Sequence, residues 1–218
     1  MHFVHCNIKL ANFLISTDRC CNDVYIIDFG LAQRYRDPRT HIHIPFQEDY
    51  KILTGTTTYA SLNNHCGVEH SRCDNLESLA YVLIYFLRGT VPWSGTKTST
   101  KKQRNKIMQM KLNSDLLNGW PDEFSLFLNY ARTLPFESKP AYTYLCKLFH
   151  DLRVREGCQH NYIFDWHLPW MDQDDCGLNP SVDVRANRKP MSKENENEKA
   201  VSIYSDRVYV SSHSDLNR

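Results

Sequence analysis

The stretch His5-Cys6-Asn7-Ile8-Lys9-Leu10-Ala11-Asn12 and the tripeptide Asp28-Phe29-Gly30 decide how this sequence folds. Between them, apolar runs at residues 13–15 and 24–27 predict two short strands, which the turn-forming residues 16–19 separate. The sequence therefore predicts a short β-hairpin that begins next to the first stretch and ends at the tripeptide.

An ordered loop is predicted from residue 34 to about residue 59, and most of the ordered chain after it is predicted to be helical. Residues 74–75 offer an N-cap to an almost continuously apolar helix at 76–87. A basic, exposed helix is predicted at 101–112, and amphipathic helices are predicted at about 121–132 and 141–152. Helices without a large sheet indicate a mainly α-helical domain.

The composition is that of a soluble globular protein. The 218 residues include 41% hydrophobic and 23% charged residues, with 26 basic against 25 acidic side chains. A net charge of +1 argues against a specific nucleic-acid partner. No apolar run reaches the roughly 18 residues that a membrane span needs. We therefore expect neither nucleic-acid specificity nor a membrane span.

The eight cysteines form no C-x-x-C pair, and the N-terminus has no charged segment followed by an apolar one. Free thiols in a reducing compartment are the simplest interpretation. We therefore expect an intracellular protein, in the cytoplasm, the nucleus or both.

The composition changes near residue 170. Residues 171–218 are rich in Ser, Asn, Asp, Glu, Lys and Arg. Such a segment buries too little apolar surface to offset the entropy lost on ordering. We expect one ordered domain at residues 1–170 and a flexible tail at 171–218.

The stretch at 5–12 resembles a variant of the protein-kinase catalytic loop, and Asp28-Phe29-Gly30 resembles the metal-binding motif that follows that loop. Over about residues 2–168 the sequence resembles the casein kinase 1 family of serine/threonine protein kinases. Ser61-Leu62-Asn63 stands where that family has a Ser-Ile-Asn-like segment and other kinases have Ala-Pro-Glu. Further resembling segments are residues 24–32, 34–45, 53–56, 71–79, 87–89, 92–93, 100–104, 139–145 and 164–166.

The resemblance implies the protein-kinase fold, with the mainly α-helical large lobe and its hairpin present here. Only four residues precede His5. We therefore expect the small lobe and its Gly-rich loop to be absent from this chain; the alternative is that the sequence is part of a longer protein. The resemblance also implies Mg²⁺ and ATP as cofactors, whose binding we expect to be weak or absent without the small lobe.

The resemblance assigns roles to four side chains. Asp28 and Asn12 match the two metal-binding positions, and both also belong to the cofactor site. Lys9 matches the lysine that neutralises the γ-phosphate. Asn7 stands where the family has the aspartate that accepts the substrate's hydroxyl proton, and an amide cannot act as a general base. The matched site is therefore catalytically degenerate.

Two further positions depart from the family pattern. Cys6 replaces the arginine of the catalytic loop. Asn75 replaces the aspartate that anchors this loop from the start of the buried helix. Its side-chain carbonyl can still accept a backbone N–H, although without charge the bond is weaker.

A pocket for anionic groups on the substrate is also implied by the resemblance. Its positions are Thr58, Gly95 and Arg104, with Lys101 on the same basic helix. Thr58 replaces an arginine and supplies no charge, so this pocket lacks one of the positive charges that the family has there. Residues 101–104 have a nuclear-localisation or nucleic-acid patch as an alternative interpretation, but an exposed helix face is preferred.

Two classes of function remain. The first is a casein kinase 1-like kinase, ATP-dependent and acting on protein Ser/Thr, that is inactive as given. The second is a pseudokinase that serves as a binding module, scaffold or decoy. Both have protein substrates or partners, and the oligomeric state stays open.

Overall fold

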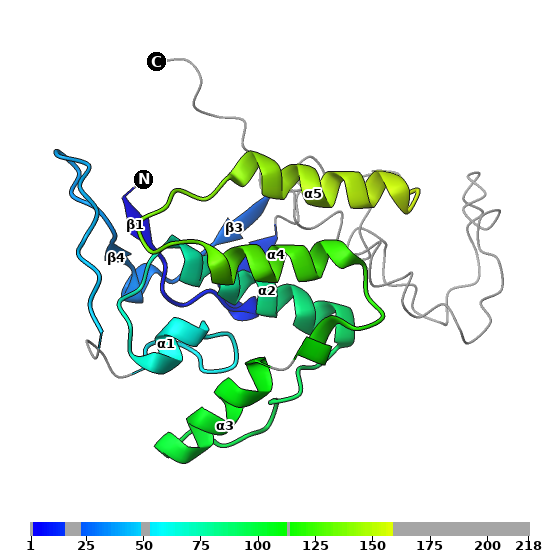
Figure 1. The fold of residues 1–218 in the computed structure, drawn as a ribbon, viewed down its shortest axis with the longest axis horizontal. Helices are drawn as coiled ribbons and strands as arrows, with labels where there is room; N and C mark the ends of the chain where they lie inside the picture. The colour runs from blue at the N-terminus through cyan, green and yellow to red at the C-terminus, as the bar shows by residue number, and fades with distance from the viewer. Residues whose placement is uncertain (1, 16–22, 49–52, 113, 159–218) are drawn as a thin grey trace, which may run out of the picture.

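The computed structural model describes residues 2–15, 23–48, 53–112 and 114–158 (Figure 1). The tail predicted at 171–218 lies outside the described residues, and so does the end of the domain predicted at 1–170.

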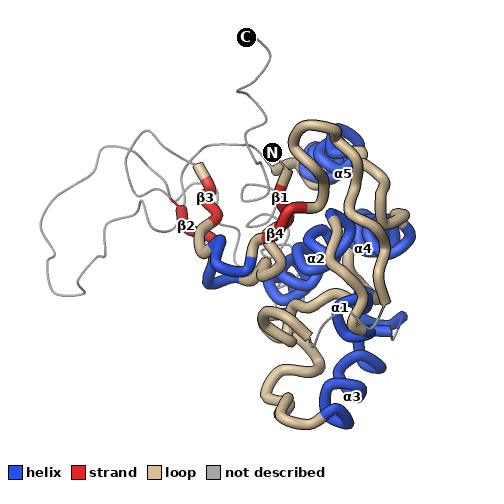
Figure 2. Tube along the Cα trace, turned by 90° about the vertical axis from the view of Figure 1, so that its left-hand side faces the viewer, coloured by secondary structure: helices blue, strands red, loops and turns tan. Residues whose placement is uncertain are grey.

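Two small antiparallel sheets carry the strands. Strand β2 (Phe13–Ile15) pairs with β3 (Val24–Ile26), and β1 (Phe3–Val4) pairs with β4 (Gln33–Arg34). The hairpin predicted from sequence is thus confirmed, one residue shorter than expected at its second strand. The pairing of β1 with β4 was not predicted. Figure 2 shows β2 and β3 at one side of the molecule, and at the other side the helices α1 (Leu62–Cys66), α3 (Lys101–Leu112), α4 (Asp122–Thr133) and α5 (Tyr142–Arg155).

Short 3₁₀ turns flank the hairpin. One spans Leu10–Asn12, directly before β2, and another spans Phe29–Leu31, shortly after β3. A third, Ser114–Leu117, follows helix α3. The two turns beside the hairpin belong to the segments that carry the predicted metal-binding side chains.

Helix α2 (Arg72–Arg88) is the centre of the fold and begins earlier than the sequence predicted. Ser71 is its N-cap and forms a capping box with Asp74, whose carboxylate accepts the Ser71 N–H at 2.7 Å. The predicted N-cap at 74–75 is therefore wrong, because Asp74 is the acidic partner inside the first turn. The neighbouring Cys73 is buried, and burial together with the Asp74 carboxylate raises the pKa of its thiol to about 12.

The other helices agree with the predicted ranges to within three residues, apart from α1, which was not predicted. They are α1 (Leu62–Cys66), α3 (Lys101–Leu112), α4 (Asp122–Thr133) and α5 (Tyr142–Arg155). Among the described residues, no helix is long and apolar enough to cross a membrane. Helix α3 was predicted to be exposed, but one of its faces is covered. Ile107 and Lys111 lie on that face and are buried.

The main core lies between α2 and α4, with α5 packed against α4. Tyr81 and Trp93 are almost fully buried there and meet edge to face at 5.5 Å between ring centroids. Phe127 and Phe149 make a similar contact at 5.5 Å between α4 and α5. Leu76, near the start of α2, belongs to this core, which therefore holds the start of that helix in place.

The strand side is packed less closely. A cavity of about 660 Å³ is lined by the hairpin and by α2, with Phe13 and Ile26 on one wall and Leu79 and Phe86 on the other. A small buried cluster of Val4, Cys6 and Tyr35 lies beside it. The hairpin therefore rests on α2 across partly empty space.

Candidate active site

His5 ties the 5–12 loop to the strand before the Asp28-Phe29-Gly30 tripeptide. Its Nε2 lies 2.8 Å from the Ile27 carbonyl oxygen, and the Asn7 N–H donates to its Nδ1 at 3.3 Å. This pattern places the proton on Nε2 and the lone pair on Nδ1. The His5 ring also contacts Phe29 edge to face at 5.0 Å. One buried imidazole thus aligns the loop with the tripeptide.

The loop is anchored from below by α2. Cys6 adopts a left-handed backbone conformation with φ 61°, and its N–H donates to the Asn75 side-chain oxygen at 3.2 Å. The anchoring role predicted for Asn75 is confirmed. Asn75 lies in the first turn of α2, which packs into the helical core. The position of the 5–12 loop is therefore fixed relative to that core.

Asn7, at the position matched to the proton acceptor, is buried with 8% of its surface exposed. Its side-chain oxygen accepts two hydrogen bonds from Thr56, one from the N–H and one from the hydroxyl, both at 3.2 Å. Its backbone oxygen accepts the Asn12 amide at 3.0 Å. The side-chain oxygen of Asn7 therefore holds a neighbouring loop, a role that sequence reasoning missed.

Gly55 makes this arrangement possible. Its φ is +79°, and a Cβ at this position would lie 2.8 Å from the Cys6 carbonyl oxygen and 3.1 Å from the Asn7 side-chain oxygen. No side chain fits in that space without a shift of the backbone. The segment that follows the glycine can approach the 5–12 loop closely for this reason.

Asn12 comes directly before β2 and Asp28 comes shortly after β3, so both lie at the open end of the hairpin. The Ile27 N–H donates to the Asn12 backbone oxygen at 3.0 Å, which places residue 28 beside residue 12. Asn12 is buried, whereas Asp28 is exposed and has a left-handed backbone with φ 66°. One amide and one carboxylate are hard oxygen donors of the kind that Mg²⁺ accepts when water and phosphate complete the shell. The pair fits such an ion.

Lys9 lies in the same loop, between Asn7 and the 3₁₀ turn. Its backbone is extended, its carbonyl accepts the Asn12 N–H at 3.0 Å, and its side chain is partly exposed. The structure therefore places the Lys9 cation on the loop that also carries Asn12, the amide predicted to bind a metal ion.

The residues predicted for an anion pocket are brought partly together. The Thr58 carbonyl accepts the Trp93 indole N–H at 2.8 Å, and Gly95, with φ 73°, is in the turn that follows Trp93. Arg104 donates to the Thr98 carbonyl at 3.2 Å, and Lys101 is exposed at the start of α3. Whether these groups bind an anion stays a prediction.

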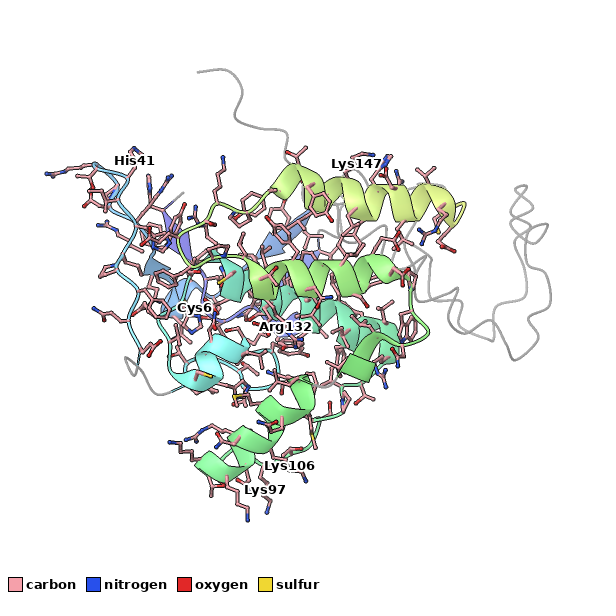
Figure 3. The ribbon with its side chains drawn as sticks, viewed as in Figure 1. Cys6, His41, Lys97, Lys106, Arg132 and Lys147 are labelled. Carbon is pink, nitrogen blue, oxygen red and sulfur yellow. The ribbon has the colours of Figure 1, made fainter. Side chains whose placement is uncertain are left out.

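Sequence reasoning missed the buried network beneath this surface. Arg132 contacts Glu77 at 3.3 Å, donates to the Tyr81 hydroxyl at 3.0 Å and donates to the Lys111 backbone oxygen at 2.6 Å. Figure 3 shows Arg132 in the middle of the molecule, whereas Lys97 and Lys106 point outward. Burial raises the pKa of the Glu77 carboxyl, an effect that the Arg132 and Tyr81 contacts oppose. The sequence offered one indication that Lys111 is buried: it lies four residues after the apolar Ile107 and therefore on the same face of α3.

Two histidines one residue apart on a strand can bind a metal ion together, and the sequence has this spacing at His41 and His43. In the structure their rings contact other groups instead. His43 Nδ1 lies 2.8 Å from the Ile44 carbonyl, and its ring packs against Phe136 at 4.8 Å. His41 packs against His2 at 5.4 Å and sits at the tip of its loop (Figure 3). Within the described part of the chain, no group of three or more His, Cys, Asp or Glu side chains could hold a metal.

A family model described as a protein kinase domain matches residues 1–162. The matched range contains every residue of the site described above.

Proposed function

Because the chain belongs to the protein kinase family, we propose that it carries the large lobe of a casein kinase 1-like serine/threonine kinase whose catalytic base position, Asn7, no longer serves as a base. The observation that carries this proposal is the pair of hydrogen bonds from Thr56 to the Asn7 side-chain oxygen. The resemblance at residues 53–63 and 71–79 supports the narrower family.

Protein kinases use ATP and Mg²⁺, and three side chains would receive them here. Asp28 and Asn12 would bind the metal ion, which would neutralise charge on the phosphates, and Lys9 would contact the γ-phosphate. Asp28 is exposed and Lys9 partly so. Solvent screens exposed charges, so we expect weak binding of Mg-nucleotide to this chain.

Asn7 lacks what the reaction needs at its position. An amide has no titratable carboxylate, so it can neither accept the hydroxyl proton nor attract the hydroxyl with a negative charge. Loss of a general base lowers a rate by roughly 10²- to 10⁴-fold. Phosphoryl transfer depends mostly on positioning and electrostatics, so weak nucleotide binding lowers the rate further.

The test is transfer of labelled γ-phosphate from ATP to casein by the purified 218-residue protein, with and without Mg²⁺. We expect no Mg²⁺-dependent transfer from the unmodified protein or from Asn7→Asp, because weak nucleotide binding persists in both. Asn105→Asp, an exposed site on α3, is the matched control for the added charge.

Two outcomes would contradict parts of the proposal. Mg²⁺-dependent transfer by the unmodified protein would overturn the inactive assignment. Transfer by Asn7→Asp but not by Asn105→Asp would show that the missing base is the main defect and that nucleotide binding is adequate.

A second candidate function is a protein-binding module, that is, a pseudokinase that acts as a scaffold or decoy. The contacts that favour it are those by which Asn7 and Trp93 hold the segment after Gly55. Binding of a polypeptide partner that is unaffected by Mg-ATP would distinguish this function from a weak kinase.

A further inference from the structure

Lys111 is completely buried near the end of α3, with 0% of its surface exposed. Its Nζ lies 2.9 Å from the Thr57 carbonyl oxygen, 2.6 Å from the Ala60 carbonyl oxygen and 3.2 Å from His65 Nε2. These are three polar contacts around an ammonium group with three N–H donors. A lysine side chain is rarely buried unless its head group is paired in this way.

The contacts of Lys111 hold residues 56–60, here called the 56–60 loop, from the core side. Its Nζ also lies 4.6 Å from the Tyr81 ring centroid and 5.3 Å from that of Trp93. Trp93 donates to the Thr58 carbonyl. Buried side chains therefore bind three carbonyls of this loop, while Asn7 binds the Thr56 N–H at its start.

Charged and titratable groups from three other helices face Lys111. Burial lowers the pKa of Lys111 to about 7; Glu77 on α2 raises it, and Arg132 on α4 lowers it. Burial, followed by Lys111 and Arg104, lowers the pKa of His65 on α1 to about 3. Near neutral pH, Lys111 therefore titrates, while the imidazole of His65 stays uncharged.

The His65 ring has one proton to place on two nitrogens. Its Nε2 faces Lys111, and its Nδ1 is buried with no hydrogen-bond partner among the described residues. When Lys111 is charged, all three of its N–H groups donate, so Nε2 must accept and the proton lies on Nδ1. When Lys111 is neutral, its two N–H groups donate to the two carbonyls, and its lone pair accepts a hydrogen bond from the Nε2–H of His65.

We propose that Lys111 is a positioning residue that holds the 56–60 loop in both of its charge states, because His65 changes from the Nδ1–H to the Nε2–H tautomer when Lys111 loses its proton. The proton lost by Lys111 goes to solvent, and His65 retains one proton throughout. The coupling between the two side chains does not depend on the proposed function.

The tautomer of His65 is measured directly by long-range ¹H–¹⁵N correlation spectra of the histidine-labelled 218-residue protein between about pH 5.5 and pH 9. As the pH rises, we expect the protonated ring nitrogen of His65 to change from Nδ1 to Nε2, with a midpoint near the Lys111 pKa of about 7. The signal is assigned by its loss in His65→Gln. A single tautomer over the whole range, or a ring that becomes charged near neutral pH, would overturn the proposal.

Two matched substitutions on α3 sharpen the test. Lys111→Met removes the charge and the titration, so His65 should hold one tautomer at every pH, whereas the exposed Lys106→Met should leave the exchange intact. Amide hydrogen exchange at residues 57–60 should rise about tenfold or more in Lys111→Met and stay unchanged in Lys106→Met. Unchanged protection in Lys111→Met would refute the positioning role.

None of these measurements uses nucleotide or casein, so their failure is separable from failure of the proposed function. If Lys111→Met does not fold, the pH titration of the unmodified protein still decides the coupling. If the protein shows the tautomer exchange and also phosphorylates casein, the role of Lys111 is supported and the assignment as an inactive kinase is refuted.

Discussion

The helical side and the strand side of this molecule are stabilised in different ways. Between α2 and α4, side chains fill the space, and Trp93 retains only 1% of its surface exposed. On the hairpin, Leu14 and Tyr25 face each other across the strands with 49% and 50% exposed. A cavity of about 660 Å³ adjoins the hairpin.

This difference in packing predicts which residues of the site are held more rigidly. Burial of one large apolar side chain stabilises a fold by about 1.5–3 kcal/mol, whereas a two-stranded hairpin is only marginally stable by itself. Asn7 and Asn75 are held from the helical side, while Asp28 follows the less tightly packed hairpin. Local opening should therefore free Asp28 before it frees Asn7.

Trp93→Ala should have the largest effect, because it removes a ring from the closed core and leaves the Thr58 carbonyl without its indole donor. We expect the free energy of unfolding to fall by about 3–5 kcal/mol, measured by urea titration with circular dichroism. Trp93→Phe, which retains a ring, should cost clearly less. Equal losses in the two variants would mean that the hydrogen bond, not packing, dominates at this position.

Gly55→Ala tests the close contact between the segment at Gly55 and the 5–12 loop. We expect a loss of about 1–2 kcal/mol from the left-handed backbone, plus a further loss from the clash with the Cys6 carbonyl. Gly119→Ala is the matched control, because its φ of +83° is similar and a Cβ there has nothing within 4 Å. Urea unfolding of both proteins gives the difference, and equal values would show that the close approach at Gly55 is not tight.

Leu14→Thr should have the smallest effect on stability, because the side chain is half exposed and threonine suits a strand. The free energy of unfolding should change by no more than about 0.5 kcal/mol. Self-association, measured by analytical ultracentrifugation, should decrease, since exposed apolar side chains promote contacts between molecules. The buried Ile84→Thr is the comparison, and a small loss there would contradict the contrast between the two sides.

Local patterns carried the sequence predictions that the structure confirms. The hairpin and the ranges of α3, α4 and α5 follow from apolar runs and periodicity over a few residues, whereas the anchoring role of Asn75 was implied by the family resemblance. The bond between Asn7 and Thr56 joins residues 49 apart in sequence, and no local pattern encodes it. The pairing of β1 with β4 likewise depends on a contact between distant segments.

The first turn of α2 was misplaced for a different reason. Asp74 is a good N-cap by residue type, but it serves Ser71 as the acidic member of a capping box, and both arrangements suit the same residues. The sequence signal was real, and its position within the motif was ambiguous.

The buried thiol of Cys73 gives this protein an internal reporter of opening. With its pKa raised to about 12, Cys73 carries almost no thiolate at neutral pH and is inert to alkylating reagents while α2 is intact. Cys66 and Cys146 are exposed and free to react in the native state. Slow alkylation of Cys73 therefore records how often the first turn of α2 comes apart, and that turn presents Asn75 to the loop above it.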